Sequence, residues 1–127
     1  MPGRPDPAWQ EEAHLLTDAR CQLAEYFQGK RRHFTLRLAP KGTPFQQRVW
    51  QELLRIPYGA TITYTELARR LGNPRAVRAV GHANGRNSIA IIIPCHRVIG
   101  HDGRLRGYAS GLACKHRLLL HEGTRLL

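Results

Sequence analysis

The sequence predicts a mainly α domain with short β segments, organised around a helix-turn-helix, and three observations carry this prediction. Thr43-Pro44-Phe45-Gln46 joins a hydroxyl N-cap to a proline at the first helical position and a glutamine at the capping-box position. Thr63, followed three residues later by Glu66, is the start signal of another helix. Gly72-Asn73-Pro74 breaks that helix and begins a third. Two short helices around a tight, glycine-containing turn form a helix-turn-helix.

Residues 1–42 are expected to form an N-terminal part with a leader, a helix, a strand and a linker. Prolines and a glycine make residues 1–7 a loose leader. Residues 9–27 fit a moderately amphipathic helix that Gly29 stops. Residues 33–38 alternate between apolar and polar side chains, which predicts a strand with one buried face. The apolar positions of the helix are Leu15, Leu16, Leu23, Tyr26 and Phe27, and those of the strand are Phe34, Leu36 and Leu38.

Residues 43–127 are expected to form the main domain, because a chain of 127 residues is long enough for one sizeable core. Its predicted elements are a helix from Thr43 to Ile56-Pro57, a short strand over 60–62, helices over 63–71 and 75–84, and a last helix from Leu112 to a C-cap at Gly123. The apolar face of the first helix is Phe45, Val49, Leu53 and Leu54, and that of the last helix is Leu112, Leu119 and Leu120, with Lys115, His116 and Arg117 as its basic positions.

The stretch Ile89 to Ile93 is apolar without alternation and leads directly into Pro94, Cys95, His96 and Arg97. Its β-branched residues predict a strand that is covered on both faces. Proline lacks the amide donor of a sheet ladder and holds the preceding residue extended. We therefore expect the strand to end at Pro94 and to present Cys95 just beyond its end.

The charge of the chain indicates a polyanionic partner. Net charge is +11, and residues 67–127 hold eleven of the 20 basic residues but two of the nine acidic ones. Nucleic acid is the expected partner and a membrane is not, because neither a lipidation motif nor an amphipathic apolar anchor is present. A generic solubilising charge is the alternative interpretation.

The third helix combines arginines with Ala, Gly and Val, and small side chains allow a backbone to approach a partner closely. It could enter a DNA groove with Arg78 projecting from it. Alternatively, it is a small-residue helix packed on its neighbours, with Arg75 and Arg78 in solvent.

The three cysteines, Cys21, Cys95 and Cys114, are an odd number without paired spacing, so no disulfide framework is indicated. With no signal peptide, a reducing cytoplasm is the expected setting. A zinc site that includes Cys95 and His96 is disfavoured, because neighbouring side chains rarely share one metal. We expect neither a metal nor another cofactor.

Cys95 is a candidate nucleophile if a histidine and an acidic residue activate its thiol. Only Asp102 and Glu122 are acidic after the helix-turn-helix, so scarcity suggests a relay of Cys95, His96 and Glu122. Neighbouring residues of an extended segment point to opposite sides, so His96 could reach Cys95 through a turn or a bridging water. The alternative is a buried, inert cysteine beside a surface histidine.

These residues also carry a resemblance to a known family. The run from Ile93 to Val98, with Asn87 before it and Gly107-Tyr108 and residues 119–123 after it, resembles the 6-O-alkylguanine-DNA alkyltransferases, also called methylated-DNA-protein-cysteine methyltransferases, most of all their bacterial form. The resemblance covers about residues 43 to 123. It implies a winged-helix-turn-helix DNA-binding domain, preceded here by a remnant helix and strand of the family's first domain.

The resemblance implies a role for each matching residue. Cys95 matches the alkyl acceptor, His96 the base that acts on it through water, and Glu122 the carboxylate that orients the histidine. Asn87 matches a hinge asparagine, and Tyr64 a tyrosine that assists base extrusion and protonates the leaving guanine. Arg78 matches the finger that fills the vacated base stack. DNA contacts are further expected at Tyr64, Arg75, Ala79 and Arg86, and pocket residues at Asn84, Val98, Tyr108, Ala109, Ser110 and Lys115.

The function implied is direct repair of DNA, in which Cys95 irreversibly takes the alkyl group from 6-O-alkylguanine, or 4-O-alkylthymine, after base flipping. The expected partner is duplex DNA, bound by a monomer in the minor groove. A non-catalytic module that recognises DNA damage or regulates, with Cys95 inert, is the rival interpretation. A cysteine hydrolase is a weaker one, because no oxyanion-hole glycine pattern surrounds Cys95.

Overall fold

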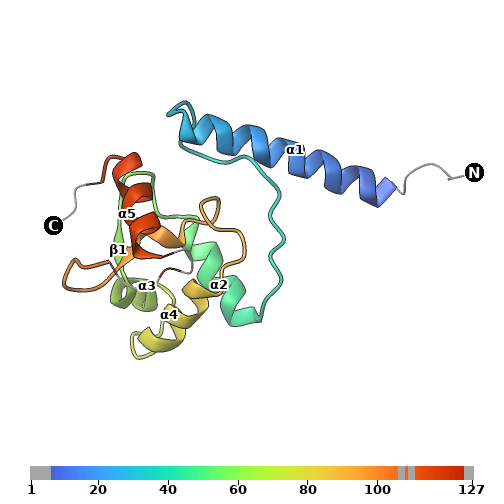
Figure 1. The fold of residues 1–127 in the computed structure, drawn as a ribbon. Helices are drawn as coiled ribbons and strands as arrows, with labels where there is room; N and C mark the ends of the chain where they lie inside the picture. The colour runs from blue at the N-terminus through green and yellow to red at the C-terminus, as the bar shows by residue number, and fades with distance from the viewer. Residues whose placement is uncertain (1–6, 106–107, 109–110, 125–127) are drawn as a thin grey trace, which may run out of the picture. The chain divides into compact units, whose positions relative to one another are not determined.

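The computed structural model describes residues 7–105, 108 and 111–124, and the side chains from Leu16 onward. It consists of helices α1 (Pro7–Phe27), α2 (Pro44–Leu53), α3 (Tyr64–Arg70), α4 (Val77–Gly85) and α5 (Leu112–His121), strands β1 (Ile62–Thr63) and β2 (Val98–Ile99), and a 3-10 helix at Cys95–Arg97 (Figure 1). The mainly α fold is confirmed. Contacts divide the chain into Met1–Leu38 and Ala39–Leu127, and the boundary after residue 42 stays a prediction. No described helix is long and apolar enough to span a membrane.

In the first unit, α1 ends near Gly29, whose φ of +76° suits a residue without a side chain. The predicted apolar face of this helix is partly wrong. Leu16 and Phe27 are exposed, whereas Tyr26 is fully buried and the polar Gln22 is nearly so. The side chain of Leu15 lies outside the described residues.

The strand predicted over residues 33–38 is wrong, since this segment has no regular secondary structure and forms no ladder in the described structure. The alternation is nevertheless real, because Phe34 is half-buried and its ring lies 5.6 Å from that of Tyr26. The Gln22 side chain accepts a hydrogen bond from the Thr35 amide at 2.9 Å and donates to the Thr35 carbonyl at 3.3 Å. One amide side chain on α1 thus satisfies the backbone groups that a neighbouring strand would have paired.

The capping box predicted for α2 is confirmed. Thr43 Oγ1 accepts from the Gln46 amide at 3.1 Å, and Gln46 Oε1 accepts from the Thr43 amide at 3.0 Å. The helix ends at Leu53, earlier than expected, so Leu54 is exposed and only Ile56 returns to the core. Sequence reasoning missed Trp50, which is buried and donates from Nε1 to the Ala83 carbonyl of α4 at 2.9 Å.

The helix-turn-helix is formed by α3 and α4, and α4 also packs on α2 (Figure 1). Thr63 caps α3 as predicted, accepting from the Glu66 amide at 3.0 Å. The next helix begins at Val77, two residues later than expected, and its N-cap Ala76 has no capping side chain. Arg75 therefore lies in the turn before α4.

The two strands join distant parts of the second unit. β1 pairs in parallel with β2, with Ile62 opposite Val98 and Thr63 opposite Ile99. The strand that was expected over 60–62 thus begins two residues later and ends one residue later, at Thr63, where α3 follows. This pairing fixes the start of the helix-turn-helix relative to the Cys95–Arg97 segment.

The buried strand predicted over Ile89–Ile93 is wrong. The segment is a turn in which the Ile93 amide bonds to the Ile89 carbonyl at 3.0 Å, and Ala90 makes only an isolated bridge to Ile93. Ile91 adopts a φ of +75°, which is rare for a β-branched residue. A run of apolar, β-branched residues forms a strand only if another segment pairs with it, and apolar residues alone do not show whether such a segment exists.

The apolar face predicted for the last helix is partly wrong, although Leu119 is buried as expected. Leu112 and Leu120 are exposed, whereas Leu118 and Leu119 are buried together with Lys115. Gly123, with a φ of +77°, follows the helix as expected.

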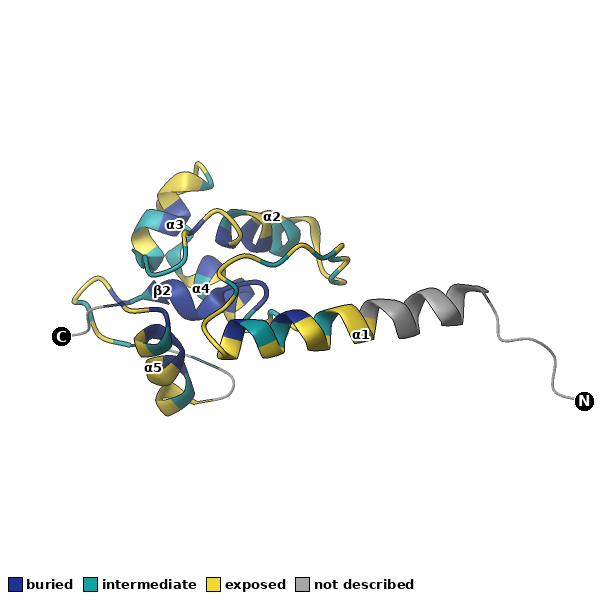
Figure 2. Ribbon diagram, turned by 90° about the horizontal axis from the view of Figure 1, so that it is seen from above, coloured by how far each residue is buried: buried dark blue, intermediate teal, exposed yellow. Residues whose placement is uncertain are grey.

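Buried residues of the second unit gather where α2, α4 and the segment around Cys95 meet, shown in dark blue in Figure 2. The core side chains are Val49, Trp50, Leu53, Ile56, Leu67, Ala68, Val80, Ala83, Ile92, Ile93, Val98, Leu118 and Leu119. Into this apolar core the chain also places His96, Arg97, Lys115 and Glu122. Charged residues are rarely buried unless they are paired, so this group marks the region where chemistry is to be sought.

Thr43→Ala tests the capping box, because it leaves the Gln46 amide without its acceptor. We expect the free energy of unfolding to fall by about 1 kcal/mol in urea denaturation. Thr65→Ala, an exposed position within α3, is the matched control and should be neutral or slightly stabilising. An equal change in both variants would show that the cap does not stabilise α2.

Candidate active site

Cys95, His96 and Arg97 form one 3-10 turn between Pro94 and β2. The turn replaces the expected extended geometry and is closed by the Arg97 amide bonding to the Pro94 carbonyl at 3.0 Å. All three side chains are buried, with Cys95 6% exposed and His96 fully enclosed. The reactive-looking triplet is therefore held inside the domain.

Glu122 is placed by contacts at the end of α5. Gly59 has a φ of +83°, and a side chain there would meet the Glu122 carbonyl oxygen at 3.1 Å. The Tyr58 hydroxyl donates to the His121 carbonyl at 3.3 Å, and Thr124 Oγ1 donates to the Gly59 carbonyl at 3.2 Å. The turn after α2 thus holds the end of α5, and with it the Glu122 backbone.

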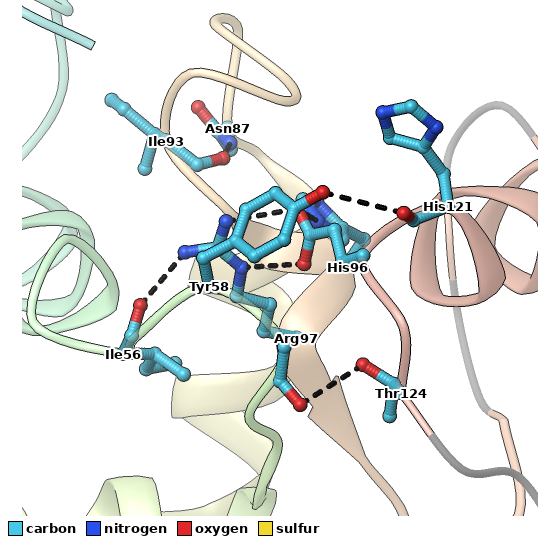
Figure 3. A network of polar contacts seen from close by, with 10 residues as sticks. Ile56, Tyr58, Asn87, Ile93, His96, Arg97, His121 and Thr124 are labelled. Carbon is cyan, nitrogen blue, oxygen red and sulfur yellow. Dashed lines mark hydrogen bonds and ion pairs between the residues drawn. The ribbon is translucent and has the colours of Figure 1, made fainter. Parts of the chain in front are cut away.

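The Glu122 carboxylate joins His96 and Arg97 in one buried network (Figure 3). His96 Nε2 lies 2.9 Å from Oε2 of Glu122. Arg97 donates from Nε to Oε1 and from Nη2 to Oε2, each at 2.8 Å, and from Nη1 to the Ile56 carbonyl at 2.7 Å. Its guanidinium also lies 5.8 Å from the centre of the Tyr58 ring. The predicted pair of His96 and Glu122 is thus brought together, and Arg97 completes it.

The network keeps Glu122 ionised. Burial alone would raise the pKa of this carboxyl, but hydrogen bonds and charge from His96 and Arg97 outweigh burial and lower its pKa from 4.5 to about 2. An ionised carboxylate can only accept hydrogen bonds, so Nε2 of His96 must carry the proton between them. In neutral His96, Nδ1 is then the basic nitrogen, and it is buried without a hydrogen-bond partner among the described residues.

Cys95 rests as a thiol. Burial raises the pKa of its side chain, and the Asn87 amide and the Lys115 charge offset this only in part. No direct hydrogen bond between the Cys95 thiol and the His96 ring is present in the described residues. A base is therefore needed before this sulfur can act as a nucleophile.

Asn87 holds the turn that precedes Cys95. Its Nδ2 donates to the Ile93 carbonyl at 2.8 Å, and its Oδ1 accepts from the Ile89 amide at 2.9 Å. Between these two bonds lies Ile91 with its unusual positive φ. One side chain thus spans a strained turn, as a hinge position would require.

Tyr64, Asn84 and Lys115 surround the other side of Cys95. Asn84 donates from Nδ2 to the Cys95 carbonyl at 3.3 Å, and Lys115 Nζ lies 3.5 Å from the Tyr64 hydroxyl. Burial, together with the Cys95 charge, raises the pKa of Tyr64. Burial also lowers the pKa of Lys115 to about 8, although a Cys95 thiolate would favour its charged form. The phenol is therefore protonated near neutral pH and can donate a proton.

Two of the remaining predicted pocket residues, Val98 and Tyr108, are described by the structure. Val98 is fully buried on β2, and Tyr108 is half-buried near Cys95, Cys114 and Glu122. Burial, aided by the negative charges around it, raises the pKa of Tyr108, so this phenol also stays protonated. Ala109 and Ser110 lie outside the described residues.

The predicted DNA-contacting residues lie on the surface of the helix-turn-helix. Arg78 and Ala79 are exposed on α4, Arg75 in the turn before it and Arg86 just after it. Tyr64 is half-buried at the start of α3, and a side chain added at Gly81 of α4 would reach its ring at 3.8 Å. This is an ordinary contact distance, so α4 packs beside Tyr64 at position 81 without requiring a glycine there.

Sequence reasoning gave Arg97 no role, although it noted the residue beside His96. The sequence did contain a hint of the pair that Arg97 forms with Glu122. Asp102 and Glu122 are the only acidic residues after the helix-turn-helix, so an arginine buried next to His96 had few possible partners. Lys115 was expected at a basic position of its helix, and its complete burial was equally unforeseen.

Glu122→Gln tests the ionised network. Because the folded pKa lies below the ordinary value, the stabilisation is complete above about pH 4.5 and is lost as pH falls toward about 2. We expect the variant to lose about 3 kcal/mol at pH 7 and to show a flatter decline between pH 4.5 and 2 in urea denaturation. Asp18→Asn, an exposed position on α1, controls for loss of a negative charge. The same acid slope in Glu122→Gln and wild type would contradict the assignment.

Known proteins share both sequence and fold with this chain. The family model for the DNA-binding domain of 6-O-methylguanine DNA methyltransferase matches residues 44–124. A methylated-DNA–protein-cysteine methyltransferase of Methanosarcina acetivorans is 55% identical over 117 residues, which cover 92% of this chain and 75% of that protein.

Two solved structures of relatives contain DNA. Mycobacterium tuberculosis OGT in complex with DNA matches with 54% identity and a TM-score of 0.82 over 84% of this chain and 66% of that one. Schizosaccharomyces pombe Atl1 in complex with damaged DNA containing O6-carboxymethylguanine matches with 32% identity and a TM-score of 0.60 over 68% of this chain and 82% of that one. The chain belongs to the 6-O-methylguanine DNA methyltransferase family.

Proposed function

We propose that this protein repairs DNA by moving the alkyl group of 6-O-alkylguanine irreversibly to Cys95. The observation that carries the proposal is a buried thiol in the same turn as a histidine whose ring is bonded to an ionised carboxylate. Relatives that share more than half of their aligned residues with this chain carry the name of this activity. The family membership and the chemistry of the site thus point to the same reaction.

The proposed reaction involves proton transfers at Cys95, His96 and Tyr64. The Cys95 thiol gives its proton to Nδ1 of His96, directly or through water, and the resulting thiolate attacks the alkyl carbon. The new S–C bond forms as the C–O bond to guanine breaks, and the leaving guanine takes a proton from the Tyr64 hydroxyl. The proton held by His96 then restores the balance at Tyr64 through solvent. In sum, the thiol proton replaces the alkyl group on guanine.

The product explains why each chain would react once. A thioether has no carbonyl for water to attack, in contrast to an acyl-cysteine intermediate. The S–C bond of the alkylated cysteine is therefore stable in water, and each protein molecule repairs one base.

DNA binding would use the surface of α4, where arginines flank small residues. A base inside a duplex hides its 6-oxygen substituent, so the nucleotide has to be flipped toward Cys95. Arg78 would fill the vacated stack from the minor groove, with Arg75, Ala79 and Arg86 along the backbone and Tyr64 beside the flipped nucleotide. Asn84, Val98, Tyr108, Ala109, Ser110 and Lys115 would surround the base. We expect one chain to bind each site as a monomer.

Intact mass spectrometry after mixing with an oligonucleotide that contains 6-O-methylguanine tests the transfer. We expect a gain of one methylene per chain, mapped to the Cys95 peptide, with no adduct on Cys95→Ser. Cys21→Ser and Cys114→Ser are the controls and should react like wild type, because both positions lie outside the Cys95–Arg97 turn. Folded, reduced protein that binds the oligonucleotide but gains no mass would instead favour a non-catalytic recognition module.

Arg78→Ala tests the proposed finger. We expect single-turnover repair in duplex DNA to slow by about tenfold or more. Without the arginine, no side chain fills the gap that the flipped nucleotide leaves in the base stack. Reaction with free 6-O-benzylguanine should change little, since no base has to be flipped. Arg55→Ala, an exposed arginine outside the helix-turn-helix, is the matched control. Equal losses of Arg78→Ala on both substrates would reject the role.

A further inference from the structure

Asn84 is a buried polar side chain on α4. It is 2% exposed, and with Val80 and Ala83 it forms the buried positions of this helix. Its Nδ2 donates to the Cys95 carbonyl at 3.3 Å. Because a carbonyl oxygen can only accept a hydrogen bond, this contact fixes the orientation of the amide. Oδ1 of Asn84 then faces another direction and is buried without a hydrogen-bond partner among the described residues.

An apolar residue would suit position 84 better if packing alone decided it. An unsatisfied acceptor in a protein core is unfavourable, and an apolar side chain of similar size, such as leucine, would avoid it. The donor nitrogen of Asn84 carries two hydrogens and can therefore serve two acceptors at once. This nitrogen is the part of the side chain that the site uses.

The second acceptor of the Asn84 amide is Tyr64. Burial and the Cys95 charge raise the pKa of this phenol, and a hydrogen bond from the Asn84 side chain offsets part of the rise. Only the nitrogen of an amide side chain donates, so Nδ2 is the atom that bonds to the phenol oxygen. α4 also packs beside the Tyr64 ring, which a side chain added at Gly81 would reach at 3.8 Å. One side chain thus bridges the Cys95 backbone and the Tyr64 hydroxyl.

Lys115 is a second donor to the same phenol oxygen, with its Nζ 3.5 Å from the Tyr64 hydroxyl. Neither an ammonium nor an amide nitrogen can accept a hydrogen bond, so the hydroxyl hydrogen points away from both groups. Burial lowers the pKa of Lys115 to about 8, although the Cys95 charge opposes this. Above that pH, a growing share of Lys115 is a neutral amine that can accept from the phenol instead. The Asn84 amide stays a donor throughout.

We infer that Asn84 is a positioning residue that holds the Tyr64 hydroxyl beside the Cys95 turn and directs its proton toward the leaving guanine. The inference rests on the proposed function, in which Tyr64 supplies that proton. The electron pair of the breaking C–O bond goes to guanine, and the Tyr64 O–H bond breaks as its proton joins the guanine. The electron pair left on the phenol oxygen faces the Asn84 amide hydrogen. Hydrogen bonds to an ionised acceptor are stronger than those to a neutral one, so this bond strengthens during the transfer.

Asn84→Leu tests the bridge, because it keeps a similar volume and removes the donor. We expect the single-turnover rate with free 6-O-benzylguanine, which needs no base flipping, to fall about tenfold. In Tyr64→Phe, which has no hydroxyl to direct, the same substitution should slow the reaction by less than about twofold. An equal loss in both backgrounds would overturn the inference. Gln51→Leu, an exposed amide on α2, is the matched control and should react like wild type.

The leaving group supplies a readout that a merely structural role of Asn84 would not change. In 8-aza-6-O-benzylguanine, a ring nitrogen replaces a C–H group, so the purine leaves more readily and depends less on a proton from Tyr64. With this substrate, we expect the loss of rate in Asn84→Leu to shrink to about threefold or less. The same loss with both substrates would contradict the inference.

NMR of the Asn84 side-chain amide tests the bridge without a substitution at this position, and so applies even if Asn84→Leu does not fold. Tyr64→Phe removes the phenol oxygen and keeps the ring. The resonance of the amide hydrogen bonded to Tyr64 should then move upfield, whereas that of the hydrogen bonded to the Cys95 carbonyl should stay. A wild-type protein that gains no mass from alkylated DNA would refute the proposed function. An active wild type whose two amide resonances do not move in Tyr64→Phe would refute this inference alone.

Discussion

The second unit depends on the enclosed Glu122 carboxylate. A single ionised carboxyl without partners would cost several kcal/mol to bury, so this group requires both His96 and Arg97. Arg97 in turn reaches the Ile56 carbonyl after α2. The ion pair thereby joins three segments that are far apart in sequence: the end of α2, the turn at Cys95 and the end of α5. The contacts that keep a buried charge stable are the same contacts that locate the proposed base.

Two buried groups of polar side chains lie on either side of Cys95, and they differ in charge. Around Glu122, a bidentate partner stabilises the ionised form and lowers the carboxyl pKa to about 2. Around Lys115, burial dominates and lowers the pKa of the ammonium to about 8, while burial also raises that of the nearby Tyr64 phenol. The Cys95 thiol thus lies between a fixed ion pair on one side and two other groups on the opposite side. Of these two, the Lys115 ammonium loses its proton more readily than usual, and the Tyr64 phenol keeps its proton.

Local signals in the sequence predicted local structure well. The caps at Thr43 and Thr63 and the glycine after α5 are where short-range hydrogen bonding places them. The two predicted strands failed for one shared reason, namely that a strand exists only if another segment pairs with it. At Thr35 the Gln22 side chain takes the place of that partner, and at Ile89–Ile93 the Asn87 side chain bends the chain into a turn.

The candidate site was predictable in its residue types and much less so in its contacts. Cys95, His96 and Glu122 could be named because acids are scarce in the second half and because the motif resembles a family. The bond from Arg97 to Glu122 spans 25 positions along the chain, and no periodicity encodes such a contact. The burial of Lys115 was missed for a related reason, since a basic residue on a helix normally points to solvent.

Little regular secondary structure supports the reactive turn. β1 and β2 are two residues long each, and the residues just before Cys95 form a turn with an unfavourable φ at Ile91. Side-chain hydrogen bonds from Asn84 and Asn87 therefore carry the positional precision that a sheet would otherwise provide. Asn84 lies on α4, the helix whose exposed face carries Arg78, and it bonds directly to the Cys95 carbonyl. One buried amide thus connects the helix that would contact the duplex to the backbone of the cysteine that would react with it.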